Sequence, residues 1–208
     1  MLVSTSFLSS NNIPRDLKKL NETDTDYIHV DVMDGKFVPN KTMPFSEMKN
    51  IYKYTSKRLD VHLMVCDPTK YIHDYASLNT EYITIHEEID VDIIEMLKLI
   101  KSYGIKCGLA IKPDTSVSNL VPYLPLLDLV LVMSVEPGAG GQKFIQESSD
   151  KIEELKNLID AYKLSIKISV DGGINLETKD YCSLCDILVS GSYIINSLDF
   201  SKQIDSLR

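Results

Sequence analysis

Positive charge is scarce in this sequence. Its 208 residues hold 22 lysines and arginines against 30 aspartates and glutamates, which gives a formal net charge of -8. Such a surface repels polyphosphate backbones and anionic lipid headgroups at long range, so we expect no nucleic acid partner and no membrane partner. A small phosphate ligand is still compatible with this charge, because backbone N–H groups at a helix N-terminus bind a phosphate locally.

Long hydrophobic runs and paired cysteines are also lacking. No stretch approaches the roughly 18 apolar residues of a membrane span, and residues 1–12 lack a basic segment followed by a long apolar one. We therefore expect a cytoplasmic protein. The four cysteines, Cys66, Cys107, Cys182 and Cys185, are too scattered for a disulfide framework. The last two form a single C-x-x-C with no second pair and no histidine nearby, which indicates buried or incidental thiols rather than a zinc or redox site.

What the chain does have is a repeated alternation of strand-like and helix-like segments. Strands that alternate with helices indicate a parallel sheet, and an open doubly wound sheet usually stops at about five or six strands. Eight strands in 208 residues favour closure of the sheet into a barrel. We therefore predict an α/β fold with a single (β/α)8 TIM barrel as one domain over residues 1–208. The apolar, β-branched runs are LVSTSFL (2–8), YIHVDV (27–32), RLDVHLM (58–64), YITIH (82–86), KCGLAI (106–111), LDLVLVM (127–133), IKISV (166–170) and DILVS (186–190).

The segments between these runs carry the apolar spacing of helices. The pattern i, i+3, i+4, i+7 predicts helices over 93–103 and 151–162. A glycine-rich segment at 134–146 is the longest piece with no predicted element, and a loop of that length in a compact domain is usually functional. Shorter connecting helices are expected at 68–77, 115–121 and 174–181.

Histidine is rare, and its positions are informative. Of four histidines, His29, His62 and His86 fall at or near the ends of predicted strands, while the fourth lies in a polar helical stretch. His29 and Asp31 are two residues apart, so their side chains point to the same side of their strand. Asp171 ends a later strand in the motif VDGG. Since the C-terminal ends of barrel strands meet at one face, these polar side chains are expected to converge there.

Two histidines and two carboxylates on one rim match the ligands of a divalent transition metal. We predict that His29, Asp31, His62 and Asp171 bind one divalent ion, which could be zinc, iron, manganese or cobalt. A single inward-facing histidine or aspartate is more often held by a structural hydrogen bond, and this is the alternative for each residue. The four together favour a metal, because two uncompensated buried aspartates would each cost several kcal/mol.

Five motifs together resemble the ribulose-phosphate 3-epimerase family, in the expected order and over almost the whole chain. The resemblance implies a TIM barrel of the ribulose-phosphate-binding type. It also implies a cytoplasmic enzyme of carbohydrate metabolism, an isomerase that inverts carbon 3 of a ketose phosphate, most simply D-ribulose 5-phosphate to D-xylulose 5-phosphate in the pentose phosphate pathway. The motifs are HVDVMDGKFVPN (29–40), LDVHLMVCDP (59–68), MSVEPGAGGQKFI (133–145), VDGGI (170–174) and VSGSYI (189–194).

The resemblance also implies roles for individual residues. His29, Asp31, His62 and Asp171 correspond to the family's metal ligands, and Asp31 and Asp171 also to its two acid/base groups. Inversion needs one such group on each face of the substrate, because a proton leaves one face and returns to the other. Residues that match substrate-binding positions, with the methionines around the reacting carbons and the glycines at the phosphate, are Ser6, Met33, His62, Met64, Met133, Gly138, Ala139, Gly140, Gly141, Gly172, Gly173, Gly191 and Ser192.

The sequence departs from the family pattern at three places. Ala139 stands where the family usually has phenylalanine, Thr5 where it usually has proline, and residues 42–45 replace a segment that commonly carries Gly-Pro. These changes bear on the loops over the site and on substrate preference. Two alternatives stay open: a 3-epimerase of a six-carbon ketose phosphate such as D-allulose 6-phosphate, and a non-catalytic phosphate-binding barrel. The sequence also leaves a homo-oligomer open.

Overall fold

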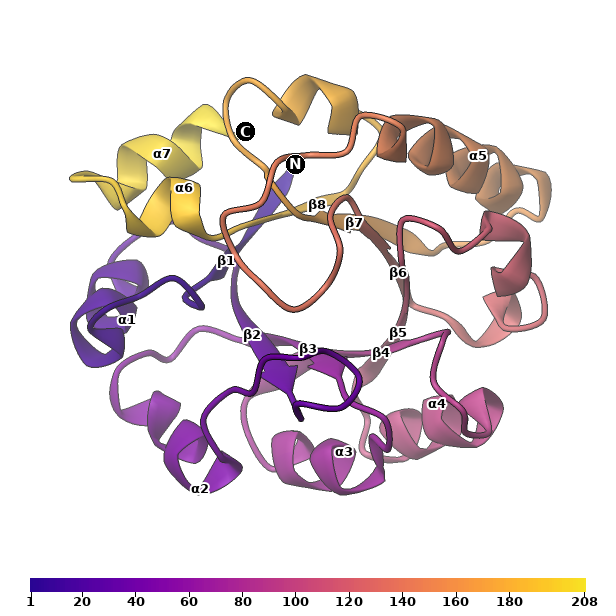
Figure 1. Cartoon of the computed structure of the whole chain (residues 1–208), viewed down its shortest axis with the longest axis horizontal. Coiled ribbons are helices and arrows are strands. Elements are labelled where there is room, and N and C mark those ends of the chain that lie inside the picture. Colours follow the sequence, from indigo (N-terminus) through magenta and orange to yellow (C-terminus); the bar gives the residue numbers. More distant parts are fainter.

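The computed structural model describes residues 1–208 and shows a closed barrel of eight parallel strands. Neighbouring strands follow chain order, and β8 closes the ring against β1 (Figure 1). The predicted TIM-barrel fold is therefore confirmed. The strands are β1 (Leu2–Ser6), β2 (Tyr27–Met33), β3 (Leu59–Met64), β4 (Thr80–His86), β5 (Lys106–Ile111), β6 (Leu129–Met133), β7 (Lys167–Asp171) and β8 (Ile187–Ser190).

Helices surround the outside of the barrel (Figure 1). None of them has the length and apolar character that crossing a membrane requires. The α-helices are α1 (Ile13–Asn21), α2 (Phe45–Met48), α3 (Thr69–Ala76), α4 (Ile93–Ser102), α5 (Ser148–Ala161), α6 (Ser192–Ile195) and α7 (Phe200–Ser206). The 3-10 helices are η1 (Lys49–Lys53), η2 (Val117–Leu120), η3 (Leu124–Leu126) and η4 (Lys179–Cys182).

Side-chain caps fix the starts of three helices. Asn12, Asp92 and Asp199 each accept a hydrogen bond from the backbone N–H three residues later, at 3.1, 3.0 and 3.0 Å. Each cap satisfies a donor that the helix itself leaves free and stabilises the helix by about 1 kcal/mol. These local signals set the beginnings of α1, α4 and α7.

Two of the expected short helices differ from an α-helix. The segment 115–121 forms only η2, and prolines at 122 and 125 remove two backbone donors that a continuing α-helix would need. The segment 174–181 forms an Asn175-centred turn before η4, because the Asn175 side chain accepts from the N–H groups of Glu177 and Thr178. The expected helix at 68–77 is present as α3.

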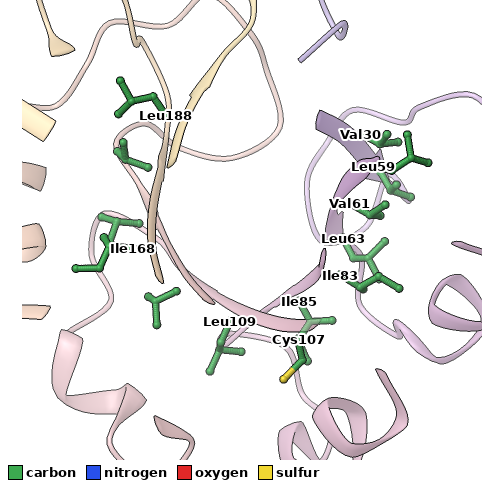
Figure 2. Close-up of a cluster of buried hydrophobic side chains, with 14 of the residues drawn as sticks. Val30, Leu59, Val61, Leu63, Ile83, Ile85, Cys107, Leu109, Ile168 and Leu188 are labelled. Carbon is green, nitrogen blue, oxygen red and sulfur yellow. The ribbon is translucent and has the colours of Figure 1, made fainter. Parts of the chain in front are cut away.

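The two faces of each strand have different surroundings. The outward faces of β2 to β5 and of β7 and β8 carry aliphatic side chains that pack against the helices (Figure 2). Inside, a smaller cluster that includes Tyr82, Leu129, Leu131 and Ile187 fills the barrel. Polar side chains line the interior at β1 to β4, so they need partners inside the barrel.

The strand register brings the predicted site residues to one end of the barrel. Asp31 on β2 pairs with His62 on β3, and Met33 pairs with Met64 two residues further along. On the other side of the ring, Met133 at the end of β6 pairs with Asp171 at the end of β7. The side chains expected to share one rim therefore do so.

Candidate functional site

Four side chains meet inside the C-terminal end of the barrel. His29, Asp31, His62 and Asp171 each offer one ligand atom, and these atoms all lie within 4.8 Å of one another. His29 Nε2 lies 3.4 Å from Asp31 Oδ1 and 3.8 Å from Asp171 Oδ2. His62 Nδ1 lies at the same two distances from the same two oxygens. The carboxylates thus stand between two imidazoles.

The residues of this cluster fit a divalent metal ion. His29 Nε2 and His62 Nδ1 are buried and have no hydrogen-bond partner, although both face the two carboxylates. A buried polar atom without a partner costs free energy, and a cation that accepts both nitrogen lone pairs removes that cost. Two nitrogens and two carboxylate oxygens suit zinc, iron, manganese or cobalt better than a hard ion.

Asp60 holds the far side of the His29 ring. His29 Nδ1 lies 2.9 Å from Asp60 Oδ2, which also accepts a hydrogen bond of 2.8 Å from Ser4 Oγ. All three side chains are buried. A carboxylate that accepts from one ring nitrogen leaves the lone pair of the other free for a metal. Asp60 was not among the residues predicted from the sequence, but its place two residues before His62 puts both side chains on the inner face of β3.

The carboxylates of Asp31 and Asp171 have different proton affinities because the protein groups around them differ. Burial raises the pKa of Asp31, but the adjacent imidazoles of His29 and His62 more than offset burial and hold the pKa well below its usual range. Burial raises the pKa of Asp171 to about 6, with repulsion from Asp31 adding to burial against the attraction of His29. Burial lowers the pKa of His29, but Asp31 and Asp60 raise it well above its usual value. Such a divergence within a carboxylate pair is typical of acid/base sites.

Ser6 orients Asp31 from the end of β1. Its Oγ donates a hydrogen bond of 2.7 Å to Asp31 Oδ2, so the other oxygen, Oδ1, is the one that faces the imidazoles. Ser6 pairs with His29 in the strand register, which places it beside the cluster. Ser6 and Asp31 both line the cavity above the four ligands.

This cavity gathers almost all of the predicted substrate-binding residues. His62 is the exception, because it is fully buried beneath the cavity floor. The predicted residues that line the cavity are Ser6, Met33, Met64, Met133, Gly138, Ala139, Gly140, Gly141, Gly172, Gly173, Gly191 and Ser192, together with Asp31 and Asp171. Lining residues that were not predicted from the sequence are Leu8, Ser9, Val135, Glu136, Pro137, Gln142, Ile174 and Val189.

The glycine-rich loop at 134–146 crosses the mouth of the barrel between β6 and α5 (Figure 1). Gly173, with φ +66°, lies so close to the loop that a Cβ there would be 2.5 Å from Phe144 N. Glycine at this position therefore lets the end of β7 and the loop pack backbone to backbone. Asn40, in the loop after β2, donates a hydrogen bond of 2.8 Å to the Gly138 carbonyl. The loops after β2 and β6 are thereby joined above the cavity.

The structure shows the contacts made at the three places where the sequence departs from the family pattern. Ala139 lines the cavity, and its carbonyl accepts a hydrogen bond from Gln142 Nε2 within the loop. Thr5 is buried and its hydroxyl lies 2.7 Å from that of Thr25. Thr42 Oγ1 accepts from the N–H of Met33 at 2.9 Å, so the segment 42–45 is tied directly to the end of β2.

The cysteines lie apart from this site. Cys182, the last residue of η4, and Cys185, three residues later, are buried without a disulfide bond. The only group of three or more histidine, cysteine or acidic residues close enough to hold a metal ion is the cluster around His29. The interpretation of the C-x-x-C pair as buried thiols agrees with this placement.

The fold and the site define a (β/α)8-barrel protein with a cluster of two histidines and two carboxylates that could hold a metal ion beneath a glycine-lined cavity. Residues 2–195 match the model of the ribulose-phosphate 3-epimerase family. The chain belongs to this family.

Similar proteins agree with this assignment. The ribulose-phosphate 3-epimerase of Buchnera aphidicola is 40% identical, with 100% of this chain and 94% of that protein covered. The enzyme of the same name from Bacillus subtilis is 36% identical, with 100% of this chain and 95% of that protein covered. Among solved structures, 3-hexulose-6-phosphate synthase from Salmonella typhimurium has a TM-score of 0.72 at 18% identity and covers 100% of this chain, with 96% of its own chain covered. That likeness supports the fold alone.

Proposed function

We propose that this protein interconverts D-ribulose 5-phosphate and D-xylulose 5-phosphate by inverting carbon 3, as a step of the pentose phosphate pathway. The observation that carries the proposal is that Asp31 and Asp171 project from β2 and β7 into one cavity, beside two buried imidazole nitrogens without partners. Family membership over residues 2–195 supports the same reaction.

In the proposed mechanism the two aspartates act on opposite faces of carbon 3. The carboxylate on one face accepts the carbon-3 proton, and the C–H bonding pair becomes the double bond of an enediolate while the carbonyl oxygen takes the negative charge. The carboxylic acid on the other face then donates its proton to carbon 3, and the carbonyl re-forms. The net change is inversion, with one aspartate left protonated and the other ionised.

Ser6 and the methionines would prepare the site for this step. Ser6 Oγ fixes one oxygen of Asp31 by a hydrogen bond of 2.7 Å, so the carboxylate cannot rotate freely. Met33, Met64 and Met133 are 4%, 2% and 2% exposed and line the cavity, so they can exclude water from the reacting carbons. Exclusion of water keeps the enediolate from being protonated directly by solvent before the second aspartate donates its proton.

His29, Asp31, His62 and Asp171 would hold one divalent ion, zinc, iron, manganese or cobalt. Bound there, the ion would act as a Lewis acid that stabilises negative charge on the substrate oxygens. The phosphate of the substrate would lie at the other end of the cavity, against Gly138 to Gly141, Gly172, Gly173, Gly191 and Ser192. Glycines at these places allow the backbone to approach a phosphate closely.

Further properties stay predictions. We propose that the chain forms one domain over residues 1–208, that it acts in the cytoplasm, and that a sugar phosphate rather than nucleic acid or membrane is its partner. A homo-oligomer is compatible with the proposal.

The reaction is tested with two substrates in deuterated water. Metal-loaded protein is incubated separately with D-ribulose 5-phosphate and D-allulose 6-phosphate, and epimer formation and deuterium at carbon 3 are followed by NMR. We expect ribulose and xylulose 5-phosphates to interconvert with deuterium at carbon 3, faster than the hexose phosphate reacts. Faster turnover of allulose 6-phosphate would assign the hexose alternative instead. No exchange with either substrate would leave a non-catalytic phosphate-binding barrel.

A further inference from the structure

A row of three side chains runs from His62 away from the metal-binding cluster. His62 Nε2 lies 2.8 Å from His86 Nε2, and His86 Nδ1 lies 2.9 Å from Glu88 Oε2. The two histidines are fully buried, and the Glu88 side chain is 19% exposed. His86 ends β4, so this row joins the fourth strand and the loop after it to a ligand on β3.

Glu88 is fixed in place by donors of the loop after β5. The Lys112 N–H donates a hydrogen bond of 2.7 Å to Glu88 Oε1, and the Thr115 hydroxyl donates a second one to the same oxygen. Glu88 Oε2 is therefore left to face His86. The Phe37 ring lies 4.7 Å from the His86 ring, centroid to centroid, and covers it. These contacts give the row one geometry with little access for water.

The chemistry of the groups fixes the direction of each hydrogen bond in the row. An ionised carboxylate only accepts, so His86 Nδ1 must donate to Glu88. A neutral imidazole that donates from Nδ1 accepts at Nε2, so His62 Nε2 must donate to His86. His62 then carries its proton on Nε2, and its Nδ1 lone pair points at Asp31 and Asp171.

We propose that Glu88, acting through His86, is a positioning residue that sets the tautomer of His62 and so prepares Nδ1 of His62 to bind the metal ion. This rests on the proposed metal site. The tautomer of His29 is set directly by a carboxylate, since Asp60 accepts a hydrogen bond from His29 Nδ1. The tautomer of His62 is set by a carboxylate that acts through one intervening histidine, because Thr84, the neighbour of His62 on β4, offers no carboxylate. Partners of this kind around a metal ligand typically change metal affinity by about 10–100-fold.

Glu88→Gln tests the proposal by reversing the direction of the hydrogen bonds along the row. Its amide oxygen must remain on the Lys112 N–H, which leaves the amide NH2 to donate to His86 Nδ1. His86 Nε2 then carries the proton and donates to His62 Nε2, so His62 is driven to place its own proton on Nδ1. We expect the affinity for Zn2+, measured by competition with a chromophoric chelator, to fall about 10–100-fold.

Glu87→Gln is the matched control, because it makes the same chemical change on the adjacent residue. The Glu87 carboxylate accepts a hydrogen bond of 3.4 Å from the Asn119 side chain and lies outside the row. Its Zn2+ affinity should equal that of the unaltered protein. Equal affinity of all three proteins would overturn the positioning role of Glu88, whereas failure of the unaltered protein to bind Zn2+ would overturn the metal site itself.

A second measurement does not depend on any variant folding. The tautomers of His62 and His86 are read from 15N chemical shifts of the metal-free, unaltered protein at mildly alkaline pH. We expect His62 to carry its proton on Nε2 and His86 on Nδ1. A proton on Nδ1 of His62 in the unaltered protein would overturn the proposal. In Glu88→Gln we expect both tautomers to reverse, a change that loss of packing alone would not produce.

Discussion

His29 Nδ1 lies 2.9 Å from Asp60 Oδ2, and this contact sets which nitrogen of His29 faces the metal-binding cluster. The free nitrogen, Nε2, is 3.4 Å from Asp31 Oδ1 and has no hydrogen-bond partner. Asp60 thus acts on the cluster without being one of its four ligands. The relationship depends on the neighbouring strands β2 and β3, where His29 and Asp60 are paired in the register.

Asp60→Asn tests this contact. The variant keeps an oxygen for His29 Nδ1 and Ser4 Oγ but removes the negative charge that makes Nε2 a stronger base. We expect Zn2+ affinity to fall by about tenfold, with the protein still folded, as judged by circular dichroism. Unchanged affinity would show that the charge of Asp60 has no influence on the cluster.

The two aspartates at the cavity are expected to be needed for turnover. Asp31→Asn and Asp171→Asn each remove a group that can exchange a proton with carbon 3, so kcat should fall by about 10²–10⁴-fold or more. Asp205→Asn, at an exposed position on α7, is the control and should keep full activity. Steady-state kinetics with D-ribulose 5-phosphate measure the effect. Retention of most activity in either site variant would contradict the two-carboxylate mechanism.

The link between the loops after β2 and β6 is expected to affect substrate binding. Asn40→Ala removes the hydrogen bond of 2.8 Å to the Gly138 carbonyl and frees the loop over the cavity. One lost hydrogen bond costs about 0.5–1.5 kcal/mol, so KM should rise by about 2- to 10-fold. Asn50→Ala removes a comparable amide-to-carbonyl bond, of 3.1 Å to Glu47, away from the cavity and should leave KM unchanged. A KM that is the same in all three proteins would argue against a role for this link.

Asp34 is expected to make stability depend on pH. Its carboxylate accepts from the N–H groups of Lys36, Phe37 and Cys66, at 2.8, 2.9 and 2.8 Å. Burial raises its pKa, but these bonds more than offset burial and lower the pKa below the ordinary 3.8. A lowered pKa in the folded protein means stabilisation that is complete above the unfolded pKa and is lost as the pH falls through the folded pKa.

Asp34→Asn should therefore lower the free energy of unfolding by about 1–3 kcal/mol at neutral pH, since its NH2 group would face the Cys66 N–H. The difference from the unaltered protein should shrink as the pH falls below about 4, where Asp34 itself becomes protonated in the unfolded chain. Urea unfolding of metal-free protein at several pH values measures this. Asp24→Asn, on the exposed surface, should show no such trend. A difference that is constant with pH would refute the assignment to Asp34.

The barrel, and the meeting of His29, Asp31, His62 and Asp171 at one of its ends, could be predicted from the sequence. Eight β-branched runs alternating with helical segments leave closure as the way to bury both faces of so many parallel strands, and all eight are strands in the structure. His29, Asp31 and His62 were predictable as inward neighbours because the side chains of a strand alternate with a period of two. The single-domain boundaries and the residue roles stay predictions from the sequence.

The groups that support His29 and His62 from behind could be identified only once the chain was folded. Asp60, His86 and Glu88 reach His29 and His62 through the register of β2, β3 and β4, and a sequence does not state register or rotamer. Asn40 meets the Gly138 carbonyl from 98 residues away because two loops happen to end above the same cavity. Such contacts depend on how distant backbone segments pack, so local periodicity cannot encode them, and they become visible only when the barrel has closed.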